Sequence, residues 1–134
     1  MKLTGETEVT FGEFSRACDL VEEYFGETLD DVALDAPVSK RQLVAVLARI
    51  QLSSHRLTVD ELADAAELVY RSDRELLYWL ERDLWSELRR EHNLAADESR
   101  AARAVHRRIV EAIDGTPECD RDPFVRIEHP IRYE

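Results

Sequence analysis

Glycine, cysteine and lysine are scarce in this chain of 134 residues, which holds four glycines, two cysteines and two lysines. Phosphate-cradling loops of P-loop and Rossmann proteins need several glycines close together, and these four are far apart, so both classes are excluded. Two cysteines cannot build a disulfide framework, and we expect unpaired thiols at Cys18 and Cys119. No apolar run approaches the roughly 20 residues that span a membrane, and no signal peptide is visible. We therefore expect a cytoplasmic protein without a membrane partner.

Metal and catalytic signatures are also missing from the sequence. There is no His-Glu-x-x-His, no Cys-x-x-Cys, no Glu-x-x-His and no Gly-x-Ser-x-Gly pattern. We expect no catalytic residues, no metal and no cofactor. The densest group of potential metal ligands lies near the C-terminus and is interpreted as a solvated acidic turn; it comprises Cys119, Asp120, Asp122, Glu128 and His129. An enzyme whose polar groups meet only in space remains a third hypothesis.

Acidic residues are in excess in this chain. Twenty-nine acidic residues face 18 basic ones, 16 of which are arginine, and the formal net charge is −11. Because 44% of the residues are hydrophobic, the composition does not fit a disordered acidic segment. A folded surface adapted to very high salt, as in halophiles that accumulate salt, fits it better. Residues 1–38 carry ten acids and two bases, so most of the excess acidity lies there.

Helix-start signals recur along the chain. Four segments have Ser or Thr followed three residues later by Glu or Gln, the pattern of a capping box; they begin at Thr10, Ser39, Thr58 and Ser72. An apolar period of three to four residues follows each one, which predicts a helix. The expected helices, including a fifth that ends before Gly115, cover residues 10–25, 39–52, 59–70, 73–92 and 96–114. Residues 27–38 are expected to form a loop with a short turn.

These elements predict an all-α fold: a compact bundle of about five helices forming one domain over residues 1–134. Its core is expected at 10–114 and an extended tail at 115–134, with minor β pairing of the termini as a possibility. The helix predicted at 73–92 is apolar around more than half of its circumference, which is typical of a central helix.

Two positions in this central helix are candidates for function. Trp79 projects opposite the leucine stripe and, with Arg82, marks an expected interaction face, because large aromatic residues anchor interfaces. The alternative is that a surrounded helix buries Trp79 as well. Glu81 projects into the apolar sector, where it forms either a structural ion pair or a functional carboxylate. The arginines at 100, 103 and 107 lie opposite the apolar stripe of their helix and are interpreted as a solvated face paired with acids.

Residues 39–93 resemble a helix-turn-helix core in outline. The run Leu57-Thr58-Val59-Asp60-Glu61-Leu62-Ala63 is similar to the start of the first helix of many prokaryotic regulators, and a short turn at residues 70–72 leads into the long helix. The resemblance implies that Arg71, Arg74 and Tyr78 face DNA. The chain departs from the pattern in three ways: the turn lacks glycine, the would-be recognition helix is too apolar and too long, and another helix, in place of a wing hairpin, is expected to follow it.

The sequence therefore favours a small cytoplasmic helical protein that acts through protein–protein contacts, as an adaptor or a homo-oligomer. The alternative is a helix-turn-helix-type DNA-binding regulator, for which nucleic acid would be the partner.

Overall fold

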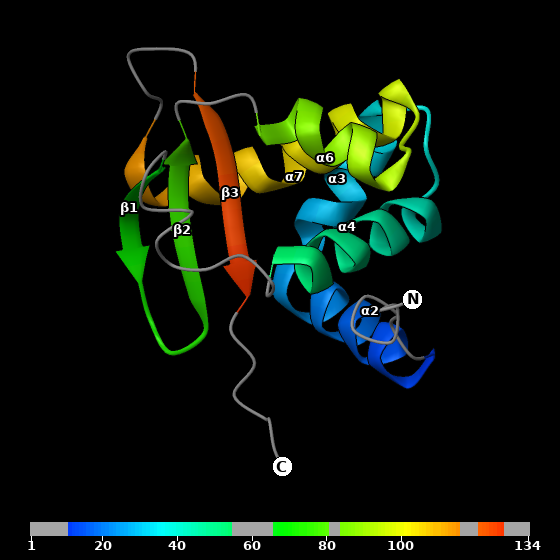
Figure 1. Cartoon of the computed structure of the whole chain (residues 1–134), viewed down its shortest axis with the longest axis horizontal. Helices are drawn as coiled ribbons and strands as arrows, with labels where there is room; N and C mark the ends of the chain where they lie inside the picture. Colours follow the sequence, from blue (N-terminus) through cyan, green and yellow to red (C-terminus); the bar gives the residue numbers. More distant parts are fainter. Residues whose placement is uncertain (1–10, 55–65, 81–83, 116–120, 128–134) are drawn as a thin grey trace, which may run out of the picture.

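The computed structural model describes residues 11–54, 66–80, 84–115 and 121–127 (Figure 1). Within them the chain forms five helices and three strands, so the expectation of an all-α fold is wrong and the protein is mixed α/β. In chain order the elements are α2 (Phe11–Phe25), α3 (Glu27–Asp35), α4 (Lys40–Ser54), β1 (Ala66–Arg71), β2 (Glu75–Leu80), α6 (Leu84–His92), α7 (Ala96–Asp114) and β3 (Asp122–Ile127). None of these helices is both long and apolar enough to cross a membrane.

Three predicted helices are confirmed, as α2, α4 and α7. The capping box of α4 is formed: the amide of Gln42 donates to Ser39 Oγ, and the amide of Ser39 donates to Gln42 Oε1, both at 3.0 Å. Gly26 ends α2 with a positive φ of 49°, which favours glycine. The segment predicted as a loop holds α3, whose Leu29 and Val32 are buried. Cys18 is a free thiol, as predicted.

The long helix predicted over 73–92 is wrong. Residues 75–80 form strand β2, and among the described residues of that stretch only 84–92 are helical, as α6. The Ser72–Glu75 pattern that predicted a helix start forms the turn of the β1–β2 hairpin instead. Ser72 Oγ accepts from the amides of Arg74 and Glu75 and donates to the Glu75 carboxylate. The same side-chain to backbone hydrogen bonds that cap helices thus close a turn here.

The three strands form an antiparallel sheet in the order β1-β2-β3. The sheet is more than a minor pairing of the termini, because its central strand β2 comes from the middle of the chain. Tyr78 of β2 lies opposite Leu68 of β1 and Phe124 of β3. A bulge between Leu68 and Tyr70 interrupts β1, the outer strand, and bulges of this kind discourage edge-to-edge pairing with other chains.

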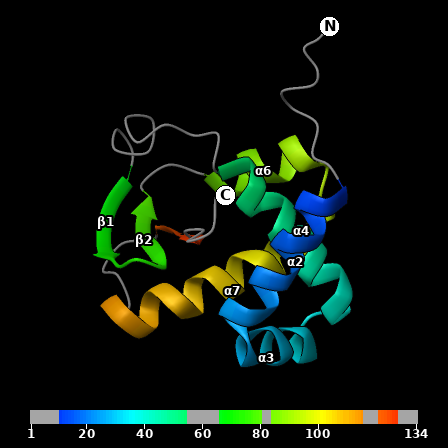
Figure 2. The same ribbon diagram turned by 90° about the horizontal axis from the view of Figure 1, so that it is seen from below.

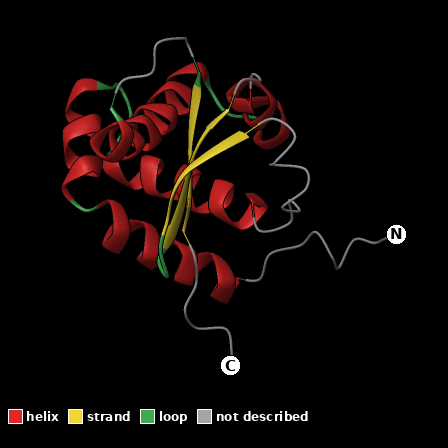
Figure 3. Cartoon of the chain, turned by 90° about the vertical axis from the view of Figure 1, so that its left-hand side faces the viewer, coloured by secondary structure: helices red, strands yellow, loops and turns green. Residues whose placement is uncertain are grey.

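Helices flank the sheet mainly on one side, as Figure 3 shows. Helix α7 runs from the other helices to the sheet, so that its C-terminal end lies beside β1 and β2 (Figure 2). Trp79 of β2 is fully buried and donates its indole N–H to Asp114 Oδ2 of α7 at 2.8 Å. On the α2 side, the Tyr24 hydroxyl donates to Glu75 Oε1 at 2.9 Å and ties that helix to the hairpin turn. One apolar core therefore joins the helices and the sheet.

Strand β3 turns its outer edge toward the helices, and side chains complete its hydrogen bonds. Gln51 of α4 is buried; its Nε2 donates to Val125 O at 2.6 Å, and its Oε1 accepts from the amide of Ile127 at 2.8 Å. Trp85 of α6 donates its indole N–H to Pro123 O at 2.8 Å. A buried backbone N–H or C=O group without a hydrogen-bond partner destabilises a fold by about 1–3 kcal/mol. Because these side chains supply the partners, the edge strand β3 can be buried.

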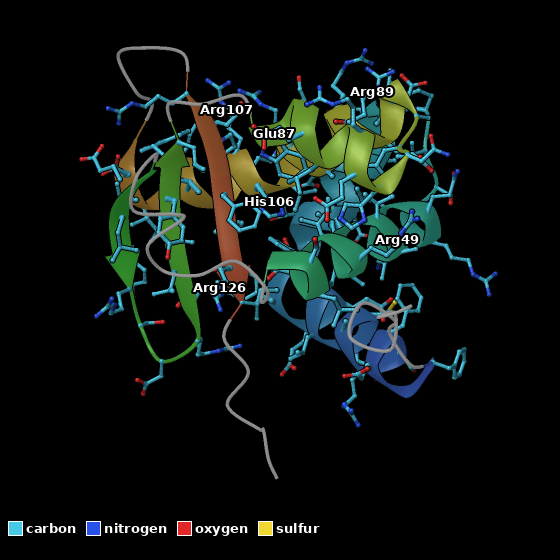
Figure 4. All side chains as sticks on the ribbon, in the orientation of Figure 1. Arg49, Glu87, Arg89, His106, Arg107 and Arg126 are labelled. Atoms are coloured by element: carbon cyan, nitrogen blue, oxygen red, sulfur yellow. The ribbon has the colours of Figure 1, made fainter. Side chains whose placement is uncertain are left out.

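His106 of α7 completes the same edge. Its Nδ1 accepts from the amide of Val125 at 2.9 Å, and its ring lies among those of Phe25, Trp85 and Phe124, with centroids 4.9–5.7 Å away. Burial lowers the pKa of His106 to about 3, so the ring is neutral and its proton resides on Nε2. That Nε2 has no hydrogen-bond partner among the described residues. Figure 4 shows the ring between β3 and the helices.

Candidate anion-binding pocket

A pocket of about 240 Å³ lies where α6, α7 and the start of β3 meet. Three of its lining residues are arginines and two are serines. The lining comprises Trp85, Ser86 and Arg89 from α6, Ala96, Ser99, Arg100 and Arg103 from α7, and Asp122 from β3. The lining therefore holds three arginines and one carboxylate, and it stays net positive when Asp97, the ion-pair partner of Arg100, is counted, in a chain whose total charge is −11.

Asp122 connects the three elements that form this pocket. Its Oδ2 accepts from the amide of Trp85 at 3.1 Å, in the first turn of α6, and its Oδ1 accepts from Arg103 Nε at 3.0 Å. The Arg103 guanidinium also donates to Arg121 O at 3.2 Å. The side chains of Arg103 and Asp122 are 28% and 12% exposed, so this ion pair is shielded from solvent. Arg103 is thereby held in one orientation with its charge at the pocket.

Arg89 and Arg100 form the exposed rim. Arg89 donates from Nε to Leu94 O at 3.3 Å, so its side chain is anchored to the α6–α7 connection. Arg100 donates from Nη1 to Asp97 Oδ1 at 2.9 Å, one turn back on α7, and its side chain is 73% exposed. Each of these arginines has five N–H donors, and the bonds named here use one of them. The other donors can turn toward an anion in the pocket.

An arrangement of this kind suits a planar anion. Guanidinium groups bind carboxylate and phosphate through paired, charge-assisted hydrogen bonds, which are about twice as strong as neutral ones. Ser86 and Ser99 lie in the first turns of α6 and α7, where the helix dipole also favours negative charge. The pocket lining holds no histidine or cysteine. The geometry therefore fits recognition of an anionic group.

Of the predicted interaction face, Trp79 and Arg82, only Trp79 lies within the described residues. Trp79 is fully buried, so the alternative in which its surroundings bury it holds, and it cannot contact a partner directly. Arg82 and Glu81 lie outside the described residues.

The residues expected to face DNA lie on a hairpin. Arg71 ends β1 and Arg74 lies in the turn; both are exposed, whereas Tyr78 is buried within β2. The helix-turn-helix resemblance requires a recognition helix where residues 75–80 form a strand, and a β1–β2 hairpin stands in its place. Of the first helix of that motif, predicted over residues 59–70, residues 59–65 lie outside the described part of the chain; residues 66–70 belong to strand β1, so the helix prediction is wrong there.

Of the predicted acidic turn near the C-terminus, only Asp122 is described, and it is engaged by Arg103 and the Trp85 amide. Within the described ranges, no three or more His, Cys, Asp or Glu side chains are grouped as metal ligands would be.

The arginine line of α7 was predicted correctly as a paired face, but its members differ. Arg107 pairs with Glu111 Oε2 at 2.7 Å along the helix, whereas Arg103 reaches Asp122 of β3. Arg89 was missed, because nothing in the sequence distinguishes it from its neighbour Arg90. Figure 4 shows Arg89 on the upper surface of α6.

Comparisons with known proteins complete this description. A family model described as "Domain of unknown function (DUF8048)" matches residues 19–131, a stretch that includes every residue of the pocket. No curated protein and no solved structure matches the chain. Because the family model covers most of the chain, the protein belongs to the DUF8048 family.

Proposed function

We propose that this protein acts through protein–protein contacts, as an adaptor without catalysis of its own, and that the arginine pocket receives an acidic side chain of the partner. The observation that carries this proposal is the cluster of Arg89, Arg100 and Arg103 around one hollow of an otherwise acidic chain. We place this contact in the cytoplasm.

The size of the pocket supports a group presented by a partner. Pockets that enclose small molecules measure about 300–1,000 Å³, and this one, at about 240 Å³, is smaller. A single carboxylate on a side chain fits it without having to be engulfed. The surrounding protein surface would then supply the remaining contacts.

High salt is compatible with this contact. At about 1 M ionic strength the Debye length is roughly 3 Å, so charges on an open surface barely attract each other. Paired hydrogen bonds to a partly shielded guanidinium act at contact distance and are screened much less. The partial burial of Arg103 therefore favours this pocket over the exposed arginines elsewhere as the site of contact in a salt-rich cytoplasm.

DNA binding is the alternative, and one observation favours it. Arg71 and Arg74 are exposed at the tip of a hairpin, where arginines can reach phosphates or a groove. Asp73 lies between them and Glu75 follows, which reduces the positive charge at this tip. The arginine pocket also suits a phosphate, so a DNA duplex is the second ligand to test.

The probe for the proposed function is N-acetylglutamate α-amide, whose only anionic group is the side-chain carboxylate. It would be titrated into the protein in molar KCl and followed by the amide chemical shifts of the pocket residues. We expect R89Q to weaken binding about tenfold, the effect of losing one charged hydrogen bond of about 1.4 kcal/mol. The matched control is R90Q, which changes the adjacent exposed arginine of α6 that does not line the pocket.

Equal affinity of R89Q, R90Q and the unaltered chain would overturn the proposed function. A parallel titration with a DNA duplex tests the alternative. Duplex binding that R71Q and R74Q abolish, without any pocket response to the glutamate probe, would establish DNA binding in its place.

A further inference from the structure

A second hollow lies on the other side of α7 from the arginine pocket. This α3–α7 groove, of about 220 Å³, runs between the end of α3 and the first half of α7. Its floor is made of small apolar residues, namely Val32, Ala36, Pro37, Ala101 and Ala104. Side chains this short leave the groove open, and a hydrophobic group placed there would cover apolar surface that solvent now reaches.

The rim of the α3–α7 groove is charged but balanced. Arg100 pairs with Asp97 at 2.9 Å, and Arg108 lies 3.8 Å from Asp35. Two arginines and two aspartates thus compensate each other around an apolar floor. The groove has no net charge to attract an ion, unlike the arginine pocket, and its chemistry selects an aliphatic group.

Arg100 connects the two hollows. It is the one residue that lines both the arginine pocket and the α3–α7 groove. Ala101 and Ala104 face the groove, whereas Ser99 and Arg103 face the pocket, so the two openings flank the same turns of α7. A ligand that reaches Arg100 from the pocket is therefore already at the rim of the groove.

We infer that the partner segment presents an acidic and an aliphatic side chain together, the first in the arginine pocket and the second in the α3–α7 groove. This inference rests on the proposed function, because the acidic side chain is what brings the segment to Arg100. One turn of a partner helix separates side chains at positions i and i+4 by about 6 Å on one face. A helical segment with glutamate and leucine four positions apart is the occupant that we assign.

Three blocked peptides test this assignment in molar KCl by calorimetry and amide chemical shifts. The parent peptide carries glutamate and leucine four positions apart; a second peptide replaces the leucine with serine, and a third replaces the glutamate with glutamine. We expect the parent to bind about tenfold more tightly than the serine peptide and to shift the amides of Ala36, Ala101 and Ala104. The serine peptide should shift only the pocket residues.

Variants of the protein provide the matched comparison. Ala104→Leu fills the α3–α7 groove and should make the parent and serine peptides bind equally. Ala112→Leu adds the same side chain to an exposed position of α7 outside the groove and should preserve the tenfold difference. The melting temperature of each variant shows that it folds, and the peptide comparison on the unaltered chain stands even if one does not.

The outcomes separate this inference from the proposed function. If the serine peptide binds as tightly as the parent while both shift the pocket, the groove assignment is overturned and the proposed function stands. If no peptide shifts the pocket, the proposed function itself fails. Sodium hexanoate is included as a non-peptide probe; if it shifts both hollows and the parent peptide shifts neither, the occupant is a fatty acid, and our assignment of a protein segment is overturned.

Discussion

Acidification should destabilise this protein through His106, and the burial of the ring indicates the size of the effect. The buried ring is neutral because burial lowers its pKa to about 3, whereas an unfolded histidine has a pKa of about 6.5. Below about pH 6.5 the unfolded chain binds a proton that the folded chain does not. The stability that the neutral His106 ring contributes is therefore fully present above about pH 6.5 and is lost progressively as the pH falls toward 3.

From these two pKa values, proton linkage gives a loss of about 2–3 kcal/mol between about pH 7 and pH 4.5. The His106→Phe variant isolates this loss. It keeps every carboxylate of the unaltered chain, so the effect of acid on the carboxylates is the same in both proteins. At neutral pH the variant should be less stable by about 1–3 kcal/mol, since the Val125 amide loses its acceptor. Near pH 4.5 this difference in stability should disappear, since protonation of His106 in the unfolded state destabilises only the unaltered chain.

Urea unfolding in molar KCl, followed by circular dichroism across this pH range, measures both curves. We expect the two stability profiles to approach each other or cross as the pH falls. Profiles that stay parallel would refute the reasoning. A proton NMR titration gives an independent check: the His106 ring should show no protonation in the folded protein at pH 4.5.

Three further predictions concern stability. Gln51→Leu removes both partners of the β3 edge and should destabilise the fold by about 3 kcal/mol in chemical unfolding, because Val125 O and the Ile127 amide remain buried; a loss below about 0.5 kcal/mol would contradict it. Asp122→Ala should cost about 2 kcal/mol in the same assay, since Arg103 and the Trp85 amide lose their shared acceptor; unchanged stability would show that water replaces it. Transfer from molar to low-millimolar KCl should lower the melting temperature by about 5 °C or more, because the net charge of −11 is no longer screened, and a constant melting temperature would speak against salt adaptation.

Amphipathic helices were predictable from this sequence because their signals are local. Val21 and Phe25 recur at helical spacing in α2 and are buried, and the Ser39–Gln42 capping box of α4 forms as expected. Phe11 lies on the same helical spacing, but it is 86% exposed, because the helix begins there and no described element covers its first turn. The periodicity of a sequence predicts which face of a helix is apolar. The elements packed against that face determine how much of it is buried.

The hairpin was not predictable from the same signals. Residues 76–80 read Leu-Leu-Tyr-Trp-Leu, and four of them are buried because β2 is the central strand of the sheet. A continuous apolar run of this length fits a strand buried on both faces as well as it fits a helix. The Ser72–Glu75 pattern favoured the helix, although the hydrogen bonds it offers also close a turn. Pairing with residues 122–127 decides between the two, and that pairing is a long-range contact.

The candidate site depended even more on long-range contacts. Its residues come from α6, α7 and β3, and no spacing in the sequence links Arg89 to Arg103 or to Asp122. Arg103 was recognised as a paired residue, but its partner could not be identified among 29 acids. Which of Arg89 and Arg90 faces the pocket is set by the rotation of α6, which depends on the burial of Trp85 and Leu88.

The most direct test of the central claim is a crystal structure of the protein with N-acetylglutamate α-amide. We predict the side-chain carboxylate in the arginine pocket, with its oxygens within about 3 Å of guanidinium nitrogens from at least two of Arg89, Arg100 and Arg103. A carboxylate bound at any other place, with the pocket unchanged, would contradict it.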